Sequence, residues 1–308
     1  MEQKAKKEWV IGVIGGDLRT VYAAQALSRA GVTCRLYALG EQRNPCAGGF
    51  EKGRCRAPYL LDEATEGADA LLLPLPLSKD GKNLNAPLST LNLPLSLLDG
   101  VALSDLPVFG GNLCYPPFLG RSAPTFDLLK EEDFAAANAK PTAEGALGLA
   151  LLEHPGLLEE SRAATLGYGN IGRCLLKRLR LLGVDCTVFA RREEQRWEAA
   201  GAGARSAPFE ELTDLLPSFD LVFNTVPAHV IGEGQACLFQ KSALYVELAS
   251  APYGMSENSR GRLPCRHLFA PGLPGKYAPL YAGGLIAKRV LAAFGAAQKE
   301  EKGRGDGR

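Results

Sequence analysis

The chain has 308 residues, which at about 150 residues per domain suggests two domains. Its 35 basic and 34 acidic side chains nearly cancel, which argues against nucleic acid or an anionic membrane as a partner of the whole chain. Hydrophobic residues make up 46%, as in an ordinary globular protein. No run of about 20 apolar residues predicts a membrane span, and residues 1–8 lack the apolar core of a signal peptide, so we expect a cytoplasmic protein.

A pattern typical of a βαβ unit opens the chain and recurs in its second half. Residues 9–37 contain a buried strand, a glycine turn, an amphipathic helix, a glycine stop and a second strand. Residues 163–189 repeat this order, with Gly167 in the place of Gly15. The repeat predicts an α/β protein of two Rossmann-like domains, each a doubly wound parallel sheet, with a cleft between them.

Cys46 and Cys55 flank a glycine-rich stretch after the first βαβ unit. None of the eight cysteines forms a C-x-x-C pair or stands at zinc-finger spacing from a histidine. A metal or redox role and a plain surface loop are both open for this pair. Cys34, Cys174 and Cys186 lie in apolar segments, where cysteine behaves as a small hydrophobic residue.

Several elements complete the first domain, which we expect to cover residues 1–138. The apolar, proline-broken region 71–98 fits either a partner surface or buried strand and loop. Residues 100–107 predict a late strand, and residues 126–137 predict a helix with an acidic start. A further helix after residue 140 ends near His154 and would bridge the domains, so Thr142 and Glu144 are expected near the cleft.

The second glycine turn carries a complete G-x-G-x-x-G at Gly167, Gly169 and Gly172. The first glycine permits the tight turn, the second lets the backbone approach a pyrophosphate, and the third lets helix and strand pack closely. In the first copy Asp17 stands in the place of Gly169 and adds a negative charge there. The sequence therefore predicts a dinucleotide site in the second domain and none in the first.

The end of the next strand indicates which dinucleotide binds. An NAD site usually has an acidic residue there, which holds the ribose 2′-hydroxyl. This chain has Arg191 and Arg192 instead, and two guanidinium groups can clamp a 2′-phosphate. NADP is therefore favoured over NAD, although Glu193 and Glu194 follow directly and a solvated arginine pair is the alternative.

The second domain is expected to span residues 139–280. Residues 210–216 predict a short helix, and 219–226, 242–249 and 267–270 predict strands whose carboxyl ends face the ligand. Residues 281–298 predict a helix that joins the first domain, and 299–308 predict a disordered tail. The expected cofactor-binding residues are Gly167, Tyr168, Gly169, Asn170, Ile171, Gly172, Arg191, Arg192, Thr225, Val226, Pro227, Ala249 and Ser250.

Taken together, the motifs resemble one family, the A subunit of the dipicolinate synthase of spore-forming bacteria. Two departures are Glu247, where an aspartate is more usual, and Tyr281, which replaces a threonine. The matching pieces run through nearly the whole chain in the family's order: GGDLR at 15–19, PTAEG at 141–145, the loop 167–172, NTVP at 224–227, LAS at 248–250, APGLPG at 270–275 and Ala278-Pro279.

The resemblance implies an NADP-dependent oxidoreductase of dipicolinic acid biosynthesis during sporulation. Its substrate would be the small dicarboxylate 4-hydroxy-tetrahydrodipicolinate, or its dehydrated form, and its product dipicolinate. It also implies a hetero-oligomer with the flavoprotein-like B subunit of dipicolinate synthase, in the cytoplasm of the mother cell. Two alternatives remain open. One is another NADP-dependent dehydrogenase that acts on a 2-hydroxy or 2-amino acid, and the other is a nucleotide-binding subunit without activity.

The substrate's carboxylates require cations, and its oxidation requires a proton acceptor. Arg19 is the first candidate for a carboxylate, and Lys276 with Tyr277 is the second. The candidate catalytic residues are Asp17, Arg19, Thr142, Glu144 and His229, among which the sequence does not single out the base; no metal site is expected.

Overall fold

A computed structural model describes residues 8–40 and 48–305, with side chains described as far as residue 296. The chain divides into two compact units, and each is described by itself. Met1–Ala137 and Pro279–Arg308 form unit 1, and Asn138–Ala278 forms unit 2. The chain passes from unit 1 to unit 2 inside helix α4 (Glu132–Glu153) and returns just before helix α11 (Pro279–Gly305).

Unit 1 contains a parallel sheet of six strands in the order β3-β2-β1-β4-β5-β6. The buried faces of β1 and β4 read as nearly continuous apolar runs, as expected for a sheet covered on both sides. Its elements before α4 are β1 (Val10–Ile14), α1 (Leu18–Arg29), β2 (Thr33–Tyr37), β3 (Cys55–Arg56), α2 (Leu61–Thr65), β4 (Ala70–Leu72), α3 (Asp99–Leu103), β5 (Val108–Gly110) and β6 (Thr125–Asp127).

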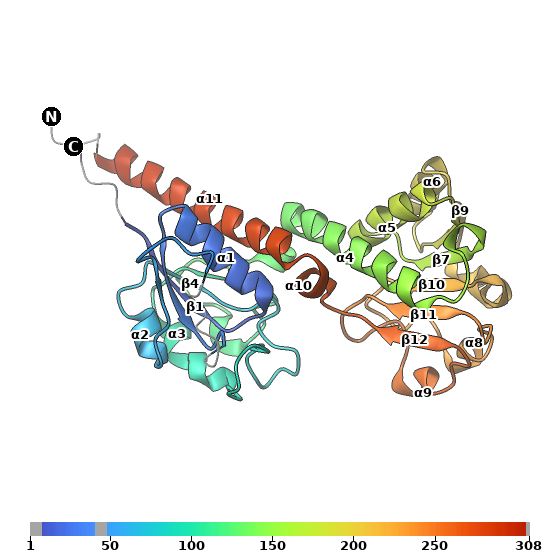
Figure 1. The fold of residues 1–308 in the computed structure, drawn as a ribbon, viewed down its shortest axis with the longest axis horizontal. Coiled ribbons are helices and arrows are strands. Elements are labelled where there is room, and N and C mark those ends of the chain that lie inside the picture. The colour runs from blue at the N-terminus through green and yellow to red at the C-terminus, as the bar shows by residue number, and fades with distance from the viewer. Residues whose placement is uncertain (1–7, 41–47, 306–308) are drawn as a thin grey trace. The chain divides into compact units, whose positions relative to one another are not determined.

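Helices cover both faces of this sheet. One face packs against α1 and α11, which lie side by side (Figure 1), and α2 and α3 pack on the other. Gly283 permits the contact of α11 with α1, because a Cβ there would lie 2.6 Å from Arg19 O. Trp9 stacks on Phe294 of α11 with ring centroids 4.3 Å apart, so the C-terminal helix is part of the core of unit 1.

Unit 2 repeats the topology, with a parallel sheet in the order β12-β11-β10-β7-β8-β9. In each sheet the first strand of the unit lies next to the fourth strand of that unit, so the order of the strands changes direction at this pair. The predicted fold class of two Rossmann-like units is confirmed. The elements are β7 (Arg162–Leu166), α5 (Asn170–Leu181), β8 (Asp185–Phe189), α6 (Glu193–Gly201), β9 (Arg205–Ala207), α7 (Leu212–Leu215), β10 (Leu221–Asn224), α8 (Glu233–Ala236), β11 (Leu244–Glu247), α9 (Glu257–Arg260), β12 (Arg266–Phe269) and α10 (Leu273–Tyr277).

Two apolar clusters hold unit 2 together, one on each face of its sheet. One contains three alanines of α4 and three leucines of α5: Ala143, Ala146, Ala150, Leu175, Leu176 and Leu179. The other contains residues of α7 and α8 and the buried ring of Tyr245. Because both faces of the sheet are covered, the carboxyl ends of the strands are where such sheets bind ligands.

Three predictions about the segments before residue 153 are wrong in detail. The expected strand at 100–107 is helix α3 followed by β5, since Leu98, Val101 and Ala102 are buried at helical spacing. The expected helix start at 126 is strand β6, which pairs with β5 and stacks Phe126 on Phe109. Helix α4 then runs without a break through Pro141, because burial of its small side chains outweighs the lost hydrogen bond.

The C-terminal tail also differs from the expectation. Helix α11 continues to Gly305, so the prediction of a disordered tail is wrong for 299–305, and 306–308 lie outside the described residues. The segment is rich in lysine and glutamate, whose high helix propensity lets a helix that is already packed continue.

The buried cysteines behave as apolar residues. Burial raises the pKa of the Cys34 thiol and of the Cys186 thiol to about 12. They occupy matching strands, β2 and β8, of the two units. Cys46 lies outside the described residues, and the described residues contain no cluster of histidine, cysteine or acidic side chains able to hold a metal ion.

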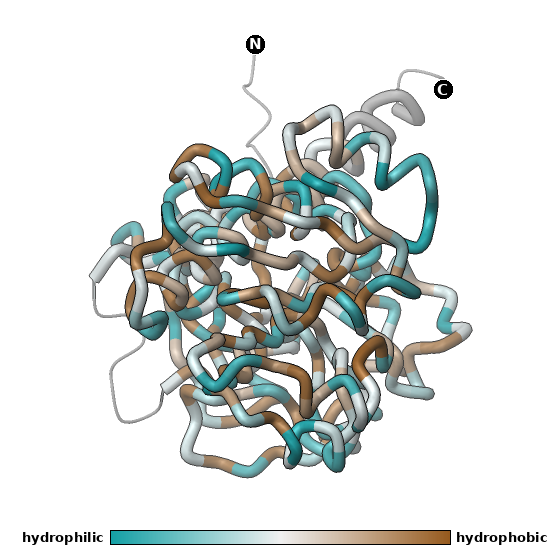
Figure 2. Tube along the Cα trace, turned by 90° about the vertical axis from the view of Figure 1, so that its right-hand side faces the viewer, coloured by the Kyte–Doolittle hydropathy of each residue, from teal (hydrophilic) through white to brown (hydrophobic). Residues whose placement is uncertain are grey.

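Apolar and hydrophilic residues alternate closely along the chain (Figure 2). None of the helices within the described part of the chain is both long and apolar enough to cross a membrane.

Candidate functional site

The glycine-rich loop of unit 2 lies between β7 and α5, and each of its three glycines has a distinct role. Gly167 has φ +94°, and a Cβ there would lie 2.6 Å from Thr225 Oγ1. A Cβ on Gly172 would lie 2.4 Å from Gly167 O, so only glycine lets the helix approach the strand this closely. A Cβ on Gly169 would meet no atom within 4 Å. The open side of the loop is thus at Gly169, where a pyrophosphate would approach the backbone.

The amino end of α5 provides unused hydrogen-bond donors. Gly169 is the N-cap residue, and its carbonyl accepts from Arg173 N at 2.9 Å. Within the described residues no acceptor faces the amides of Asn170 and Ile171, as is normal for a first helical turn. These amides and the helix dipole favour an anion. The loop therefore fits the diphosphate of a dinucleotide.

The side chain of Tyr168 anchors the glycine-rich loop to the core of unit 2. Its side chain is buried, and burial is the main cause that raises the pKa of its hydroxyl. The Arg173 guanidinium lies 5.0 Å from the centre of the ring, and Gln195 Nε2 donates to Tyr168 O at 3.2 Å. The backbone of Tyr168 belongs to the candidate cofactor site, whereas its ring packs into the core.

Arg191 and Arg192 lie in the turn between β8 and α6. Both are exposed, and among the described residues neither guanidinium has a hydrogen bond or an ion pair. Arg196 holds the turn, since its Nη1 donates to Ala190 O at 2.9 Å and to Arg191 O at 3.0 Å. Two free guanidinium groups therefore stand at the position that recognises the adenosine ribose in this fold. Arg196 was not expected from the sequence, because its role depends on a bond across the turn.

The loops that follow β10 and β11 are joined to each other. Gly254 O accepts from Val230 N at 2.9 Å and from Ile231 N at 3.1 Å. His229 Nε2 lies 3.2 Å from Pro252 O, and a carbonyl can only accept, so Nε2 carries the proton and Nδ1 the lone pair of the neutral ring. The expected residues Thr225 and Val226 lie at the start of the first loop, against Gly167.

The remaining expected residues of these loops differ in exposure. Pro227 and Ser250 are exposed, and Ala249 is buried. Their backbone and exposed side chains are therefore what a ligand would contact.

In unit 1, Asp17 and Arg19 form one ion pair at the start of α1. Arg19 Nε donates to Asp17 Oδ1 at 2.9 Å and Nη2 to Asp17 Oδ2 at 2.8 Å, and Nη2 also donates to Leu75 O. Asp17 Oδ1 accepts from Arg19 N as well, which caps the helix. The carboxylate of Asp17 thus occupies the helix start that is left open at Gly169 in unit 2. Arg19 Nη1 has no partner among the described residues.

Four other sequence candidates lie on α4 and α10 of unit 2. Thr142 is buried, and its hydroxyl donates to Asn138 O at 3.1 Å. Glu144 is exposed and pairs with Arg178 Nη2 at 2.7 Å. Lys276 is exposed on α10, where the ring of Tyr277 packs against Gly145 and Gly148 of α4.

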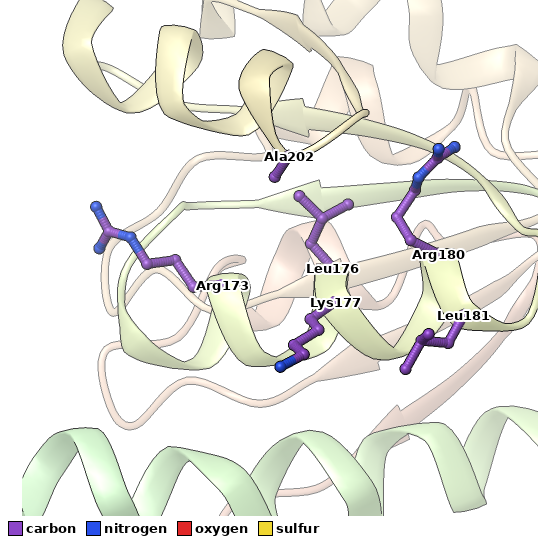
Figure 3. A pocket seen from close by; sticks show the side chains of 6 residues that line it. All are labelled: Arg173, Leu176, Lys177, Arg180, Leu181 and Ala202. Carbon is purple, nitrogen blue, oxygen red and sulfur yellow. The ribbon is translucent and has the colours of Figure 1, made fainter.

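A cavity of about 430 Å³ lies along α5, between this helix and Ala202 at the end of α6 (Figure 3). Three basic side chains and the apolar surface between them form it. Within the described residues, only Arg173 of these three has an ion pair, with Glu198. The lining residues are Arg173, Leu176, Lys177, Arg180, Leu181 and Ala202.

Comparisons with known proteins show similarity in sequence and fold. The family model for the N-terminal domain of the A subunit of dipicolinate synthase matches residues 10–114. The A subunit of dipicolinate synthase from Bacillus subtilis (strain 168) is 28% identical over 174 residues, which are 56% of this chain. That alignment spans 59% of the relative, less than two thirds of its length.

Two solved structures share the fold over nearly the whole chain. The A subunit of dipicolinate synthase from Bacillus halodurans superposes with a TM-score of 0.80 at 23% identity, covering 93% of this chain and 97% of the other. A transhydrogenase of Sinorhizobium meliloti superposes with a TM-score of 0.65 at 15% identity, covering 92% of this chain and 93% of the other.

Proposed function

We propose, from its similarity to the A subunit of dipicolinate synthase, that this chain is the NADP-dependent oxidoreductase component that makes dipicolinate. The substrate would be 4-hydroxy-tetrahydrodipicolinate or its dehydrated form. The observation that carries the proposal is the loop 167–172, whose open position at Gly169 and free helix-end amides fit the diphosphate of a dinucleotide.

The chemistry balances with one nicotinamide cofactor. Loss of water from the substrate gives dihydrodipicolinate, and loss of one hydride and one proton then gives the aromatic pyridine. NADP⁺, when bound, would accept the hydride. The protein must hold the two carboxylates and the ring, and accept the proton.

Arg19 is our candidate for one substrate carboxylate. Its guanidinium is oriented by Asp17 and Leu75 O, and Nη1 has no partner among the described residues. Asp17 accordingly positions Arg19, since both of its oxygens already accept from that side chain. Lys276 with Tyr277 is the alternative candidate, because Lys276 is exposed on α10 and has no ion pair among the described residues.

His229 is our candidate for the proton acceptor. Its Nε2–H bond to Pro252 O leaves Nδ1 free, and the ring is exposed. Replacing His229 with glutamine should lower kcat by about 100-fold, the contribution typical of a general base. Titration with NADPH should give an unchanged Kd, and a kcat within a factor of about three of wild type would rule His229 out as the base.

Arg191 and Arg192 are proposed to bind the 2′-phosphate of NADP. Replacing both with alanine removes charge-assisted bonds worth about 1.5–3 kcal/mol each, so the Kd for NADPH should rise by at least about 100-fold. The Kd for NADH, which lacks the phosphate, should stay within about twofold. Arg205→Ala is the matched control, since that exposed arginine on β9 pairs with Asp185 instead. Equal losses for both nucleotides would contradict NADP specificity.

The proposal extends to partner and place. A relative that is named an A subunit implies that at least one more subunit exists. The resemblance points to the flavoprotein-like B subunit of dipicolinate synthase as the partner in a hetero-oligomer. The same resemblance points to sporulation and to the cytoplasm of the mother cell.

A coupled assay tests the function. Aspartate semialdehyde, pyruvate and dihydrodipicolinate synthase would be mixed with this chain and NADP⁺, with and without the B subunit. We expect dipicolinate absorbance and NADPH to rise together when both proteins are present, and the reaction with one protein alone shows which chain carries the hydride step. No product in any combination, with NADPH still bound, would refute the dipicolinate reaction.

A further inference from the structure

A buried carboxylate lies beneath the two loops that follow β10 and β11. Glu247 ends β11 and is 1% exposed. Its Oε1 accepts from Asn224 Nδ2 at 2.7 Å and from Ala249 N at 3.1 Å. Its Oε2 accepts from Tyr245 Oη at 2.7 Å and from Gly254 N at 2.8 Å. Four donors and no direct cationic partner among the described residues hold this charge.

Three of the four donors belong to the loop segments or their roots. Ala249 and Gly254 bracket the second loop, so one carboxylate fixes both of its ends. Asn224 ends β10, and its side chain bonds both Val226 N, at 3.1 Å, and Val226 O, at 3.0 Å. Glu247 therefore fixes the backbone at 224–226 and at 249–254. Gly254 O in turn accepts from Val230 N and Ile231 N, which ties these two residues to the second loop.

The packing around Glu247 leaves no room for a different arrangement of these two loops. A Cβ on Gly254 would lie 2.4 Å from Asn224 Nδ2 and 2.8 Å from Tyr245 Oη. Burial first, and the neighbouring Glu247 second, raise the pKa of the Tyr245 hydroxyl, which keeps it protonated as a donor. The outer side of the loop is held by Arg260, whose guanidinium lies 5.9 Å from the ring of Tyr253.

These loops lie at the half of the sheet that faces the reacting end of a dinucleotide. The glycine loop after β7 takes the diphosphate, and the end of β8 takes the adenosine ribose. The nicotinamide would then lie at the carboxyl ends of β10 and β11. We propose that Glu247 is a positioning residue that holds both nicotinamide-side loops in their binding conformation; this rests on the proposed function.

Glu247→Gln provides the sharpest test, because it keeps the shape of the side chain and replaces one acceptor oxygen with a donor. Its amide nitrogen must face either Ala249 N or Gly254 N, so one backbone donor meets another donor. Tyr245→Phe is the matched control: it removes a donor of the same carboxylate, but one that lies within β11 and not in a loop.

Two measurements on the full-length chain decide the matter. In Glu247→Gln we expect the Kd for NADPH to rise by about tenfold or more, and the Kd for 2′-phospho-ADP-ribose, which lacks nicotinamide, to stay within about twofold. Tyr245→Phe should leave both within about twofold. Amide hydrogen exchange should accelerate at 225–231 and 249–254 in Glu247→Gln, but not in β7 or β8.

Equal loss for both nucleotides would overturn the proposal and make Glu247 a general stability residue. Unchanged affinities, or unchanged exchange in the loops, would overturn it as well. Failure of wild type to bind either nucleotide would instead refute the cofactor part of the proposed function. The exchange measurement needs no ligand, so it still decides whether Glu247 holds the loops.

Discussion

Alanine at Gly169 is expected to raise the Kd for NADPH by about a thousandfold, because two charge-assisted hydrogen bonds worth about 2 kcal/mol each would be lost at the diphosphate. The fold should survive, since a Cβ at this position meets no atom within 4 Å. Gly169 has φ −86°, which alanine adopts readily, so the free energy of unfolding should fall by no more than about 1 kcal/mol.

Gly172→Ala separates binding from folding in the same loop. Its Cβ would lie 2.4 Å from Gly167 O, so helix α5 must move away from β7. We expect a loss of about 1–3 kcal/mol in stability, together with weaker binding. Fluorescence titration with NADPH and urea denaturation measure the two effects. If Gly169→Ala bound NADPH like wild type, the diphosphate would not lie at this loop.

Asp17→Ala should lower the free energy of unfolding by about 3–5 kcal/mol, since it leaves a buried arginine without its counter-charge and removes a helix cap. Arg19 is only 6% exposed, and Asp17 supplies both the ion pair and the bond to Arg19 N. Urea denaturation of the full chain measures the loss.

Two further variants separate the causes. Asp17→Asn keeps a capping oxygen but not the charge, so the difference between it and Asp17→Ala measures the cap. Asp17→Asn combined with Arg19→Met removes both charges and should recover most of the stability that Asp17→Asn loses. A stable Asp17→Asn single variant, within about 0.5 kcal/mol of wild type, would show that the pair contributes little.

Much of the fold was predictable from the chain because the signals are local. The glycine turn at Gly15 and its counterpart at Gly167 each lie between a buried strand and an amphipathic helix, and the order of elements predicted two parallel sheets. The family resemblance rests on short motifs that stand in the same order along the chain. Local signals also misled: separate helices were expected at 126–137 and after residue 140, but the buried helix α4 runs through both segments and through Pro141.

The sequence by itself determined the fold class, the family resemblance and the glycine-rich loop at 167–172, since each depends on neighbouring residues and their spacing. Only the tertiary structure decided that Asp17 and Arg19 neutralise each other, and that Arg196 holds the turn which leaves Arg191 and Arg192 free. It alone revealed Glu247 as the anchor of two loops, because its four donors come from four positions of the chain. Whether a charged side chain binds a ligand or its own protein depends on partners that spacing does not specify, and folding brings those partners together.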